Sequence, residues 1–324
     1  MKKFIILFIT MVLLTGCYNY HELETLGITS SILFDYVDDK YNLTIEIIED
    51  SKPITFTGEG KSISEALERA LRSSGKLLSY YHLNTVILTK NVDIKDILFY
   101  LIRNPQVNNT FYIVLTNSTN IFDEKEDIGK KISDILKRNK SYTFFELSKT
   151  LVDDKIDLVL PVIGEDLSVQ SMMPFSKFKL TKEMELDKIE IYRILLNESG
   201  SYIEGTCPDA KSFFEINTNQ VDTKIKVKDK IMISIDLEAS ISEFNCNIDT
   251  TDVKNIKKLQ DIIDKKVQEA GYSLINELKD NDADILGFNR YIYQRRHNLD
   301  KDWQNYDYEI DVQTHINKKG LILK

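Results

Sequence analysis

Cysteine, histidine and long apolar runs are all scarce in this chain of 324 residues. Three cysteines are too few for a disulfide framework. The histidines lack metal-ligand spacing such as H-E-x-x-H, so a surface or hydrogen-bonded core role is favoured for each; they are His21, His82, His297 and His315. After the first residues no apolar run is long enough to span a bilayer.

An excess of positive charge is also missing. The formal net charge is −9, which disfavours binding to nucleic acid or electrostatic adhesion to anionic lipid. There is no repeat, heptad pattern or low-complexity tract. The length is sufficient for two or three domains.

The apolar run that is present lies at the start of the chain. Lys2 and Lys3 precede the apolar segment Phe4–Leu14, which at about 1.5 Å per residue covers roughly half of a ~30 Å hydrocarbon core. It is therefore predicted to be a secretory signal and not a membrane helix. Leu14-Thr15-Gly16-Cys17 has the pattern of a bacterial lipobox, so residues 1–16 are the predicted signal peptide, with cleavage after Gly16 and lipidation of Cys17. An ordinary signal peptide with a nearby cysteine is the alternative.

This leader predicts that everything after Cys17 is extracytoplasmic, with membrane contact through the lipid. Its removal takes away two lysines, which makes the chain more acidic. Cys207 and Cys246 then either form a single disulfide or are both small buried residues, and we favour the second interpretation.

Residues 17–122 are predicted to form an N-terminal α/β domain. Alternation predicts strands within 28–48, with a turn at Asp38-Asp39. A change to helical spacing predicts a helix from Ile63 that stops before Gly75. Strands are expected at 82–88 and 110–115, and a helix at 94–102.

Residues 123–185 are predicted to be a middle domain with two helices, at roughly 127–138 and 143–153, after a charged hinge at 123–127. A short apolar strand at 158–163 contains Pro161, which predicts an edge position or a strand end.

Residues 186–324 are predicted to be a C-terminal α+β domain. Strands are expected at 187–196, 201–205, 231–239 and 306–316, and a long helix at about 252–279. One-faced strands around a long helix predict an antiparallel or mixed sheet with the helix packed on one side. The overall fold class is therefore α+β, or mixed α/β, with three domains.

Two sequences resemble catalytic motifs but fail on position. Gly58 to Ser62 resembles the end of a phosphate-binding loop, but the required first glycine is Thr55. Ser62 and Glu65 instead fit a helix capping box, in which the Glu65 carboxylate bonds back to the Ser62 N–H. Ser73-x-x-Lys76 has the S-x-x-K spacing of penicillin-recognising enzymes, but it lies at the end of a helix and not at its start. There is no G-x-S-x-G, and the acidic runs lack the pattern of a calcium loop. No enzyme activity, cofactor or metal site is predicted.

Several segments, in order along the chain, resemble the GerAC-like (Ger(x)C) family, the C-subunit lipoproteins of spore germinant receptors. Gly16-Cys17-Tyr18 followed by Glu22-Leu23 is similar to the G-C-W-[DN]-x-x-E-[IL] start of the family, with Tyr18 in place of Trp. Other similar segments lie at 58–66, 82–83, 103–105, 284–288 and from Trp303 to the end, although Asn289 replaces a family Gly. The motif positions are Gly60, Glu65, Ala66, His82, Arg103, Pro105, Asp284, Gly287, Phe288, Trp303 and Gly320.

The resemblance implies a non-catalytic lipoprotein on the outer face of the spore inner membrane. It would assemble with A- and B-type receptor subunits and act in nutrient-triggered germination. A solute-binding lipoprotein of a transporter is the alternative, which would require two similar α/β lobes. A cell-envelope hydrolase is a third possibility, for which the sequence shows no nucleophile or metal constellation.

Overall fold

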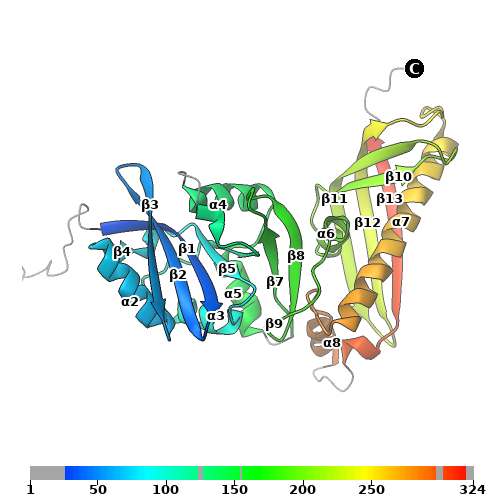
Figure 1. Ribbon diagram of the computed structural model, residues 1–324. Helices are drawn as coiled ribbons and strands as arrows, with labels where there is room; N and C mark the ends of the chain where they lie inside the picture. Colours follow the sequence, from blue (N-terminus) through cyan, green and yellow to red (C-terminus); the bar gives the residue numbers. More distant parts are fainter. Residues whose placement is uncertain (1–25, 123–126, 154, 297–301, 319–324) are drawn as a thin grey trace, which may run out of the picture.

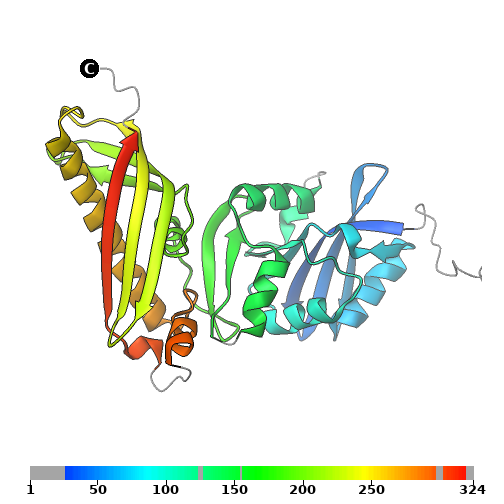
Figure 2. The ribbon, with the colours of Figure 1, turned by 180° about the vertical axis from the view of Figure 1, so that it is seen from behind.

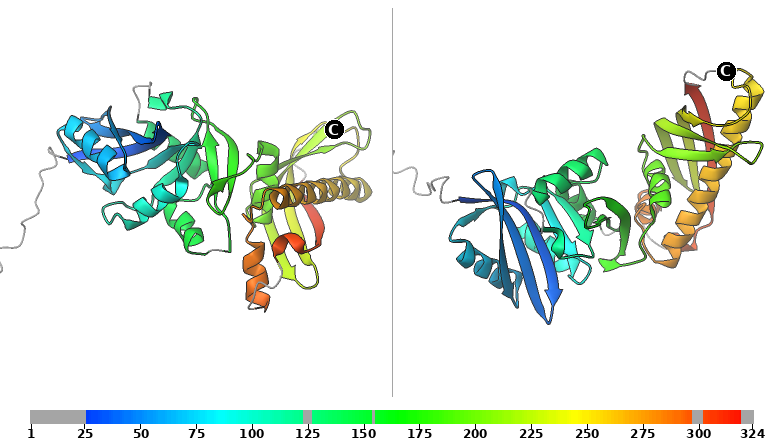
Figure 3. Two further views of the ribbon diagram at one scale, coloured as in Figure 1. Left: turned by 60° about the horizontal axis from the view of Figure 1, so that its bottom comes forward. Right: turned by 45° about the horizontal axis from the view of Figure 1, so that its top comes forward.

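The computed structural model describes residues 26–122, 127–153, 155–296 and 302–318. They form two lobes, one built on a nine-stranded sheet and the other on a four-stranded sheet (Figure 1). Leu26, the first described residue, lies at the end of the first lobe that points away from the second lobe, and β13 ends at the far tip of the second (Figure 3).

The first lobe contains nine strands and four helices. The strands are β1 (Leu26–Val37), β2 (Lys40–Glu49), β3 (Lys52–Gly60), β4 (Leu77–Ser79), β5 (Thr85–Thr89), β6 (Tyr112–Thr116), β7 (Val159–Ile163), β8 (Val169–Ser176) and β9 (Lys179–Leu180). The helices are α2 (Ile63–Ser74), α3 (Ile94–Arg103), α4 (Ile128–Arg138) and α5 (Phe144–Val152), with 3₁₀ turns η2 (Tyr80–His82) and η3 (Asn120–Phe122).

The order of the first sheet is β3-β2-β1-β5-β6-β7-β8-β9, with β4 beside β1. Its central pairs, from β1 to β7, are parallel, and the pairs on both sides are antiparallel. Alternate residues of the central strands face opposite sides: Val86 packs with α2, α3 and α5, whereas Ile87 packs with α4. A parallel sheet covered on both faces explains the continuous apolar runs in β5 and β6. The strands at 123–185 continue this sheet, and the division into domains at 17–122, 123–185 and 186–324 stays a prediction.

The second lobe contains α6 (Leu186–Leu195), β10 (Tyr202–Thr206), β11 (Phe213–Val227), β12 (Ile231–Phe244), α7 (Val253–Asp280), α8 (Phe288–Arg296), the 3₁₀ turn η4 (Trp303–Asn305) and β13 (Tyr308–Lys318). The strands are ordered β10-β11-β12-β13, and only the last pair is parallel. The 28-residue helix α7 covers one face, and Figure 2 shows β11, β12 and β13 in front of it. The predicted mixed sheet with a long helix on one side is therefore confirmed.

Local signals explain most element ends. Asp38 and Asp39 both have positive φ, 52° and 59°, as the predicted tight hairpin turn requires. Gly75 ends α2 with φ 65°. The Ser62 hydroxyl oxygen accepts the Glu65 N–H at 3.2 Å, as predicted. The Glu65 carboxylate, however, accepts the N–H of Lys61 at 2.8 Å and not that of Ser62, because the extended Ser62 leaves the Lys61 N–H facing the first turn.

A buried carboxylate holds α4 against the first sheet. Glu46 of β2 is almost fully buried and accepts the N–H groups of Ile128 and Gly129, both at 2.9 Å, and the hydroxyl of Ser31 at 2.8 Å. Burial raises the pKa of the Glu46 carboxyl, and these hydrogen bonds oppose the rise. The position at the start of a helix also favours negative charge.

The prediction of a strand at 187–196 is wrong, because these residues form the helix α6. β-Branched and aromatic residues in this segment favour a strand locally, but packing decides the outcome. One helical face is buried in the core of the second lobe and consists of Ile191, Tyr192, Ile194 and Leu195. The predicted strand from His82 also begins later, at Thr85, because His82 belongs to η2.

The prediction that Pro161 marks an edge or a strand end is also wrong, since β7 lies between β6 and β8. Pro161 is opposite Met172 of β8. The backbone N–H and carbonyl of Met172 are both bonded to Met184. These groups therefore point away from β7, and Met172 needs no N–H from Pro161. On the other side, β6 pairs only with Val162 and Ile163. The missing N–H of proline therefore costs no ladder bond.

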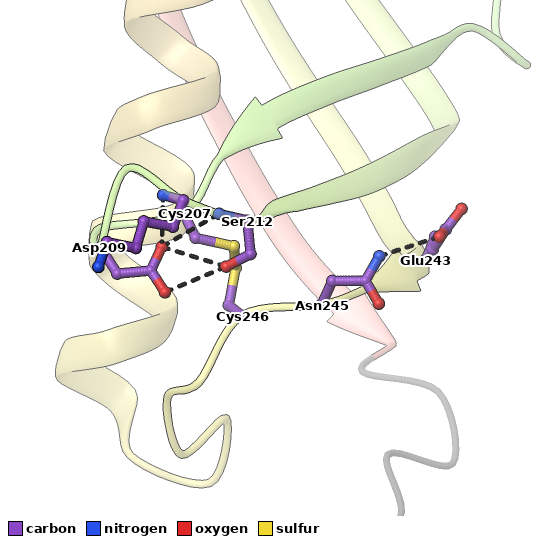
Figure 4. The surroundings of a disulfide bond; sticks show 7 residues. Cys207, Asp209, Ser212, Glu243, Asn245 and Cys246 are labelled. Atoms are coloured by element: carbon purple, nitrogen blue, oxygen red, sulfur yellow. Dashed lines mark hydrogen bonds between the residues drawn. A yellow bond between two sulfur atoms is a disulfide. The ribbon is translucent and has the colours of Figure 1, made fainter.

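Cys207 and Cys246 form a disulfide, with Cα atoms 5.5 Å apart (Figure 4). Our preference for two separate buried cysteines is therefore wrong, although both residues are buried. The strand register brings them together, because β10 ends opposite Phe213 and β12 ends opposite Phe214. A separation of 39 residues in the sequence gave no sign of this.

Candidate functional site at the junction of the lobes

The motif residues Gly60 and Ala66 lie where β3 meets α2. Ala66 is fully buried. A Cβ on Gly60 would lie 2.6 Å from the Ala66 nitrogen, and one on Gly58 would lie 2.1 Å from the Ala66 oxygen. The small residues thus allow the strand and the helix to approach closely, while Glu65 caps the helix as described above.

The start of α2 borders a groove of about 810 Å³. Lys61 and Ser62 line one part of it, and Arg103 and Pro105 at the end of α3 line another. Two segments far apart in the sequence are therefore brought to one groove. The Arg103 guanidinium lies 5.8 Å from the centre of the Phe99 ring, which is a cation–π geometry.

Tyr41 contributes a hydroxyl to the same groove. It donates to Asp96 at 3.2 Å. Partial burial, and then the charge of Asp96, raise the pKa of Tyr41 to about 12, so the hydroxyl stays protonated at neutral pH.

His82 lies apart from these residues. It is exposed in η2, and its ring meets the Tyr81 ring edge-on at 5.3 Å. Within residues 26–318 as described, no three His, Cys, Asp or Glu side chains gather in a way that could hold a metal ion.

The C-terminal motif residues meet the first lobe at a junction formed by Asp157, just before β7, and Asp284, just before α8. The Asp157 N–H donates to the Asp284 carbonyl at 3.0 Å, and the Asp284 N–H donates to the Asp157 carboxylate at 2.8 Å. The other Asp157 oxygen accepts the Lys177 N–H at 2.9 Å. One side chain thus joins the β8–β9 turn to the second lobe, and charge-assisted bonds of this kind are stronger than neutral ones.

The Asp284 side chain points to the start of α8. Its two carboxylate oxygens accept the N–H groups of Phe288 and Asn289, both at 2.7 Å. Gly287, which lies between Asp284 and Phe288 in the sequence, has φ 70°, and a Cβ there would lie 3.3 Å from Ile156 of the first lobe. The glycine therefore serves both the backbone turn and the close approach of the lobes.

Aromatic rings support α8 from the second lobe. Phe288 stacks on Trp303 with ring centres 5.7 Å apart and meets Tyr308 edge-on at 5.2 Å. Both Phe288 and Trp303 are almost fully buried. The backbone N–H of Trp303 donates to the Asn289 side-chain oxygen at 3.2 Å. Asn289, which replaces a glycine of the motif, therefore contributes a hydrogen bond to the junction.

Burial raises the pKa of Asp284 from 3.8 to about 7, and the nearby charge of Asp157 adds to the rise, whereas the bonds from Asn289 and Phe288 lower it. An unfolded chain releases this proton near its ordinary pKa, and the folded chain releases it near pH 7. The stabilisation is therefore complete below about pH 4 and is lost as the pH rises through about 7. Burial also raises the pKa of Asp157.

Two ion pairs lie around the junction. Arg290 of α8 lies 3.4 Å from Asp153, with 55% and 28% of their side chains exposed. Lys177 lies 3.3 Å from Asp282, and both of these side chains are more exposed. Pairs of this exposure contribute about 0–1 kcal/mol. The hydrogen-bonded carboxylates of Asp157 and Asp284 and the buried rings therefore dominate the junction.

The junction joins Asp284, Gly287, Phe288 and Trp303, while Gly60, Glu65, Ala66, Arg103 and Pro105 gather around α2 and the groove. Gly16, Cys17 and Gly320 lie outside the described residues. Sequence reasoning missed Asp157. The only signal was an acidic residue directly before an apolar strand, which is common in chains of this composition.

The fold is that of a two-lobed, mixed α+β protein. A solved structure has the same fold. The structure titled "Crystal Structure of the GerBC protein" matches 92% of this chain and 100% of its own, with a TM-score of 0.56 and 14% sequence identity. The long helix on a four-stranded sheet and the larger first sheet thus belong to a known architecture.

Two family models match in succession. "Spore germination protein N-terminal domain" covers residues 19–165, and "Spore germination B3/ GerAC like, C-terminal" covers residues 171–320. The chain belongs to this GerAC-like family of spore germination proteins, as the resemblance of its motifs predicted. It is 24% identical over 322 residues to the Spore germination protein GerQC of Bacillus cereus, covering 90% of this chain and 89% of the relative. It is 22% identical over 391 residues to the Spore germination protein KC of Bacillus subtilis (strain 168), covering 98% and 95%.

Across the described residues, none of the helices combines the length and the apolar character that a membrane crossing requires.

Proposed function

We propose that this protein is the C-type lipoprotein subunit of a spore germinant receptor. It assembles with A- and B-type subunits, has no catalytic role, and is required for nutrient-triggered germination. The observation that carries the proposal is the match of both family models, in order, over almost the whole chain.

The anchor is the lipid on Cys17, after removal of residues 1–16, and the protein lies on the extracytoplasmic face of the spore inner membrane. The disulfide between Cys207 and Cys246 supports an extracytoplasmic location, because disulfide bonds persist in oxidising compartments. The nine residue-to-residue steps from Cys17 to Leu26 span about 30 Å at most when the chain is extended. The first lobe would therefore face the membrane, with the second lobe held away from it.

The junction supports a structural role for the motif residues. The carboxylates of Asp157 and Asp284 are both engaged by backbone N–H groups, and the rings of Phe288 and Trp303 pack on each other. This arrangement fixes the position of α8 between the lobes. A transporter's solute-binding protein would be expected to have two similar lobes, whereas the two sheets here differ in strand number and order.

The anchor and the assembly can be tested with Cys17→Ala in spores. The variant is expected to leave the inner-membrane fraction in large part, because no acyl chain holds it. Affinity purification of the wild-type chain from solubilised membranes is expected to recover the A- and B-type subunits. If Cys17→Ala stays fully in the membrane fraction, subunit contacts and not the lipid form the main tether. If neither subunit is recovered with the wild-type chain, the receptor assignment fails.

A further inference from the structure

The end of the first lobe that carries Leu26 has a groove of about 490 Å³. Residues of α2, β4 and η2 line this groove, and Figure 1 shows α2 and β4 at the end of the lobe that points away from the second lobe. Leu26 lines the groove too, and it lies opposite Leu77 in the parallel pairing of β1 with β4. The described part of the chain therefore begins at the rim of the groove.

Apolar side chains in this groove are open to solvent. Leu77 is 49% exposed and Tyr81 is 68% exposed. Three further lining residues are half-buried: Leu26, Leu78 and Tyr100. Single exposed apolar residues are common on protein surfaces, but these gather around one concavity. A patch of this kind is typical of a surface that another apolar body covers.

Two ion pairs stand beside the groove. Arg72 lies 2.6 Å from Glu68, which lines the groove. Lys76, directly before β4, pairs with Glu49 of β2. Each pair carries no net charge, so these pairs favour neither an anionic nor a cationic partner. The apolar side chains are therefore the main means by which the groove can bind.

The length of the chain before Leu26 indicates what lies within reach of this surface. The proposed anchor at Cys17 is nine residue-to-residue steps away, or about 30 Å at most. The groove therefore stays within that distance of the bilayer surface. A short tether gives an effective concentration on the order of millimolar, at which a weak apolar contact is occupied.

We propose that this groove docks on the lipid bilayer. Leu26 and Leu77 enter the boundary between headgroups and acyl chains, and the Tyr81 ring lies at the level of the headgroups, where tyrosine is enriched in membrane proteins. This contact orients the first lobe on the membrane, which a flexible tether alone does not do. The inference rests on the lipid anchor proposed above. Because the neighbouring ion pairs are neutral, docking does not require anionic lipid.

Quenching by brominated lipid tests the contact, with the full lipidated chain in phosphatidylcholine vesicles. Tyr81→Trp places a reporter in the groove, and the emission of the wild type, from the buried Trp303 of the second lobe, is subtracted as background. The reporter is expected to lose emission when brominated phosphatidylcholine replaces the ordinary lipid. The loss should be the same when half of the lipid is phosphatidylglycerol.

Val37→Trp is the matched control on the same lobe. Val37 is 43% exposed and ends β1, so it lies roughly 36 Å from Leu26 at about 3.3 Å per residue. Its reporter is expected to keep its emission in brominated lipid. Less quenching of Tyr81→Trp than of Val37→Trp, or equal quenching of the two, would overturn the proposal.

A second pair of variants tests the apolar character of the contact. Leu77→Asp, combined with Tyr81→Trp, is expected to abolish the quenching, because a charge would have to leave water to enter the lipid. Val37→Asp in the same background is expected to leave it unchanged. Both positions are exposed, so neither aspartate disturbs the core. Equal quenching in the two combinations would also overturn the proposal.

Flotation of the same vesicles reads the anchor separately. A chain that floats with the vesicles while the Tyr81→Trp reporter keeps its emission is anchored as proposed, and only the docking of the groove is refuted. A chain that does not float contradicts the anchor, and the docking fails with it because the tether is its premise.

Discussion

Replacing Asp157 with alanine removes a side chain that accepts hydrogen bonds from backbone groups of both lobes. It takes the acceptors from the N–H groups of Lys177 and Asp284. Hydrogen bonds to a charged group contribute about 1.5–3 kcal/mol each. Because Asp157 is only partly buried, we use the lower end of this range. The two bonds then amount to about 3 kcal/mol, or a roughly hundredfold change in a local opening equilibrium.

Hydrogen–deuterium exchange of the full chain measures this opening. Amides at 177 and 284 are expected to exchange about a hundredfold faster in Asp157→Ala, while those of β12 stay protected. Asp153→Ala is the matched control, since it removes a neighbouring carboxylate whose partner across the junction is the exposed Arg290. Its effect is expected to stay below about fivefold. Equal exchange in the two variants, or unchanged exchange in Asp157→Ala, would refute the assignment of Asp157 as the main polar link.

Three further predictions concern the second lobe and the junction, and denaturation followed by fluorescence of Trp303, the single tryptophan, measures each of them. Because the pKa of Asp284 rises to about 7, the free energy of unfolding should fall as the pH rises from 4 to 8. Asp284→Asn should remove up to about 4 kcal/mol of that dependence; parallel pH profiles would contradict it. Opening the 39-residue loop with Cys207→Ala and Cys246→Ala should cost about 4 kcal/mol; an unchanged midpoint would show that the bond does not constrain the unfolded lobe. Gly287→Ala, at φ 70°, should cost about 1–2 kcal/mol, and a neutral effect would mean that the turn relaxes.

The elements that could be predicted from the sequence are those whose burial pattern is regular. In β12, Ile231, Ile233, Ile235 and Leu237 alternate with exposed or half-buried residues, and all four are buried in the core that the sheet shares with α7. The turn at Asp38-Asp39 and the end of α2 at Gly75 depend on local backbone preferences, so they were also predictable.

Elements whose conformation depends on distant partners could not be predicted. Helix α6 contains residues that favour a strand, and only its packing in the second lobe makes it helical. Strand β3 has few apolar residues on either face, so its extended conformation depends on its pairing with β2. The proline of β7 is tolerated because Met172 bonds to Met184 on one side and because β6 pairs only with Val162 and Ile163 on the other.

The candidate site was predictable only in part, for the same reason. Motif resemblance marked Asp284, Gly287, Phe288 and Trp303, but nothing in their spacing shows that they meet Asp157, 127 residues before Asp284.

The proposed role of this chain is that of a receptor subunit required for the response of spores to nutrients. Its most direct test is the fall in optical density of a spore suspension after nutrient addition. Spores would lack this gene and the other receptors of the same family, with or without a restored wild-type copy expressed together with its A- and B-type subunits. We predict a response only in the restored spores, while a trigger that bypasses nutrient receptors acts on both. Germination of the deleted spores with every nutrient, at the rate of the restored ones, would contradict the claim.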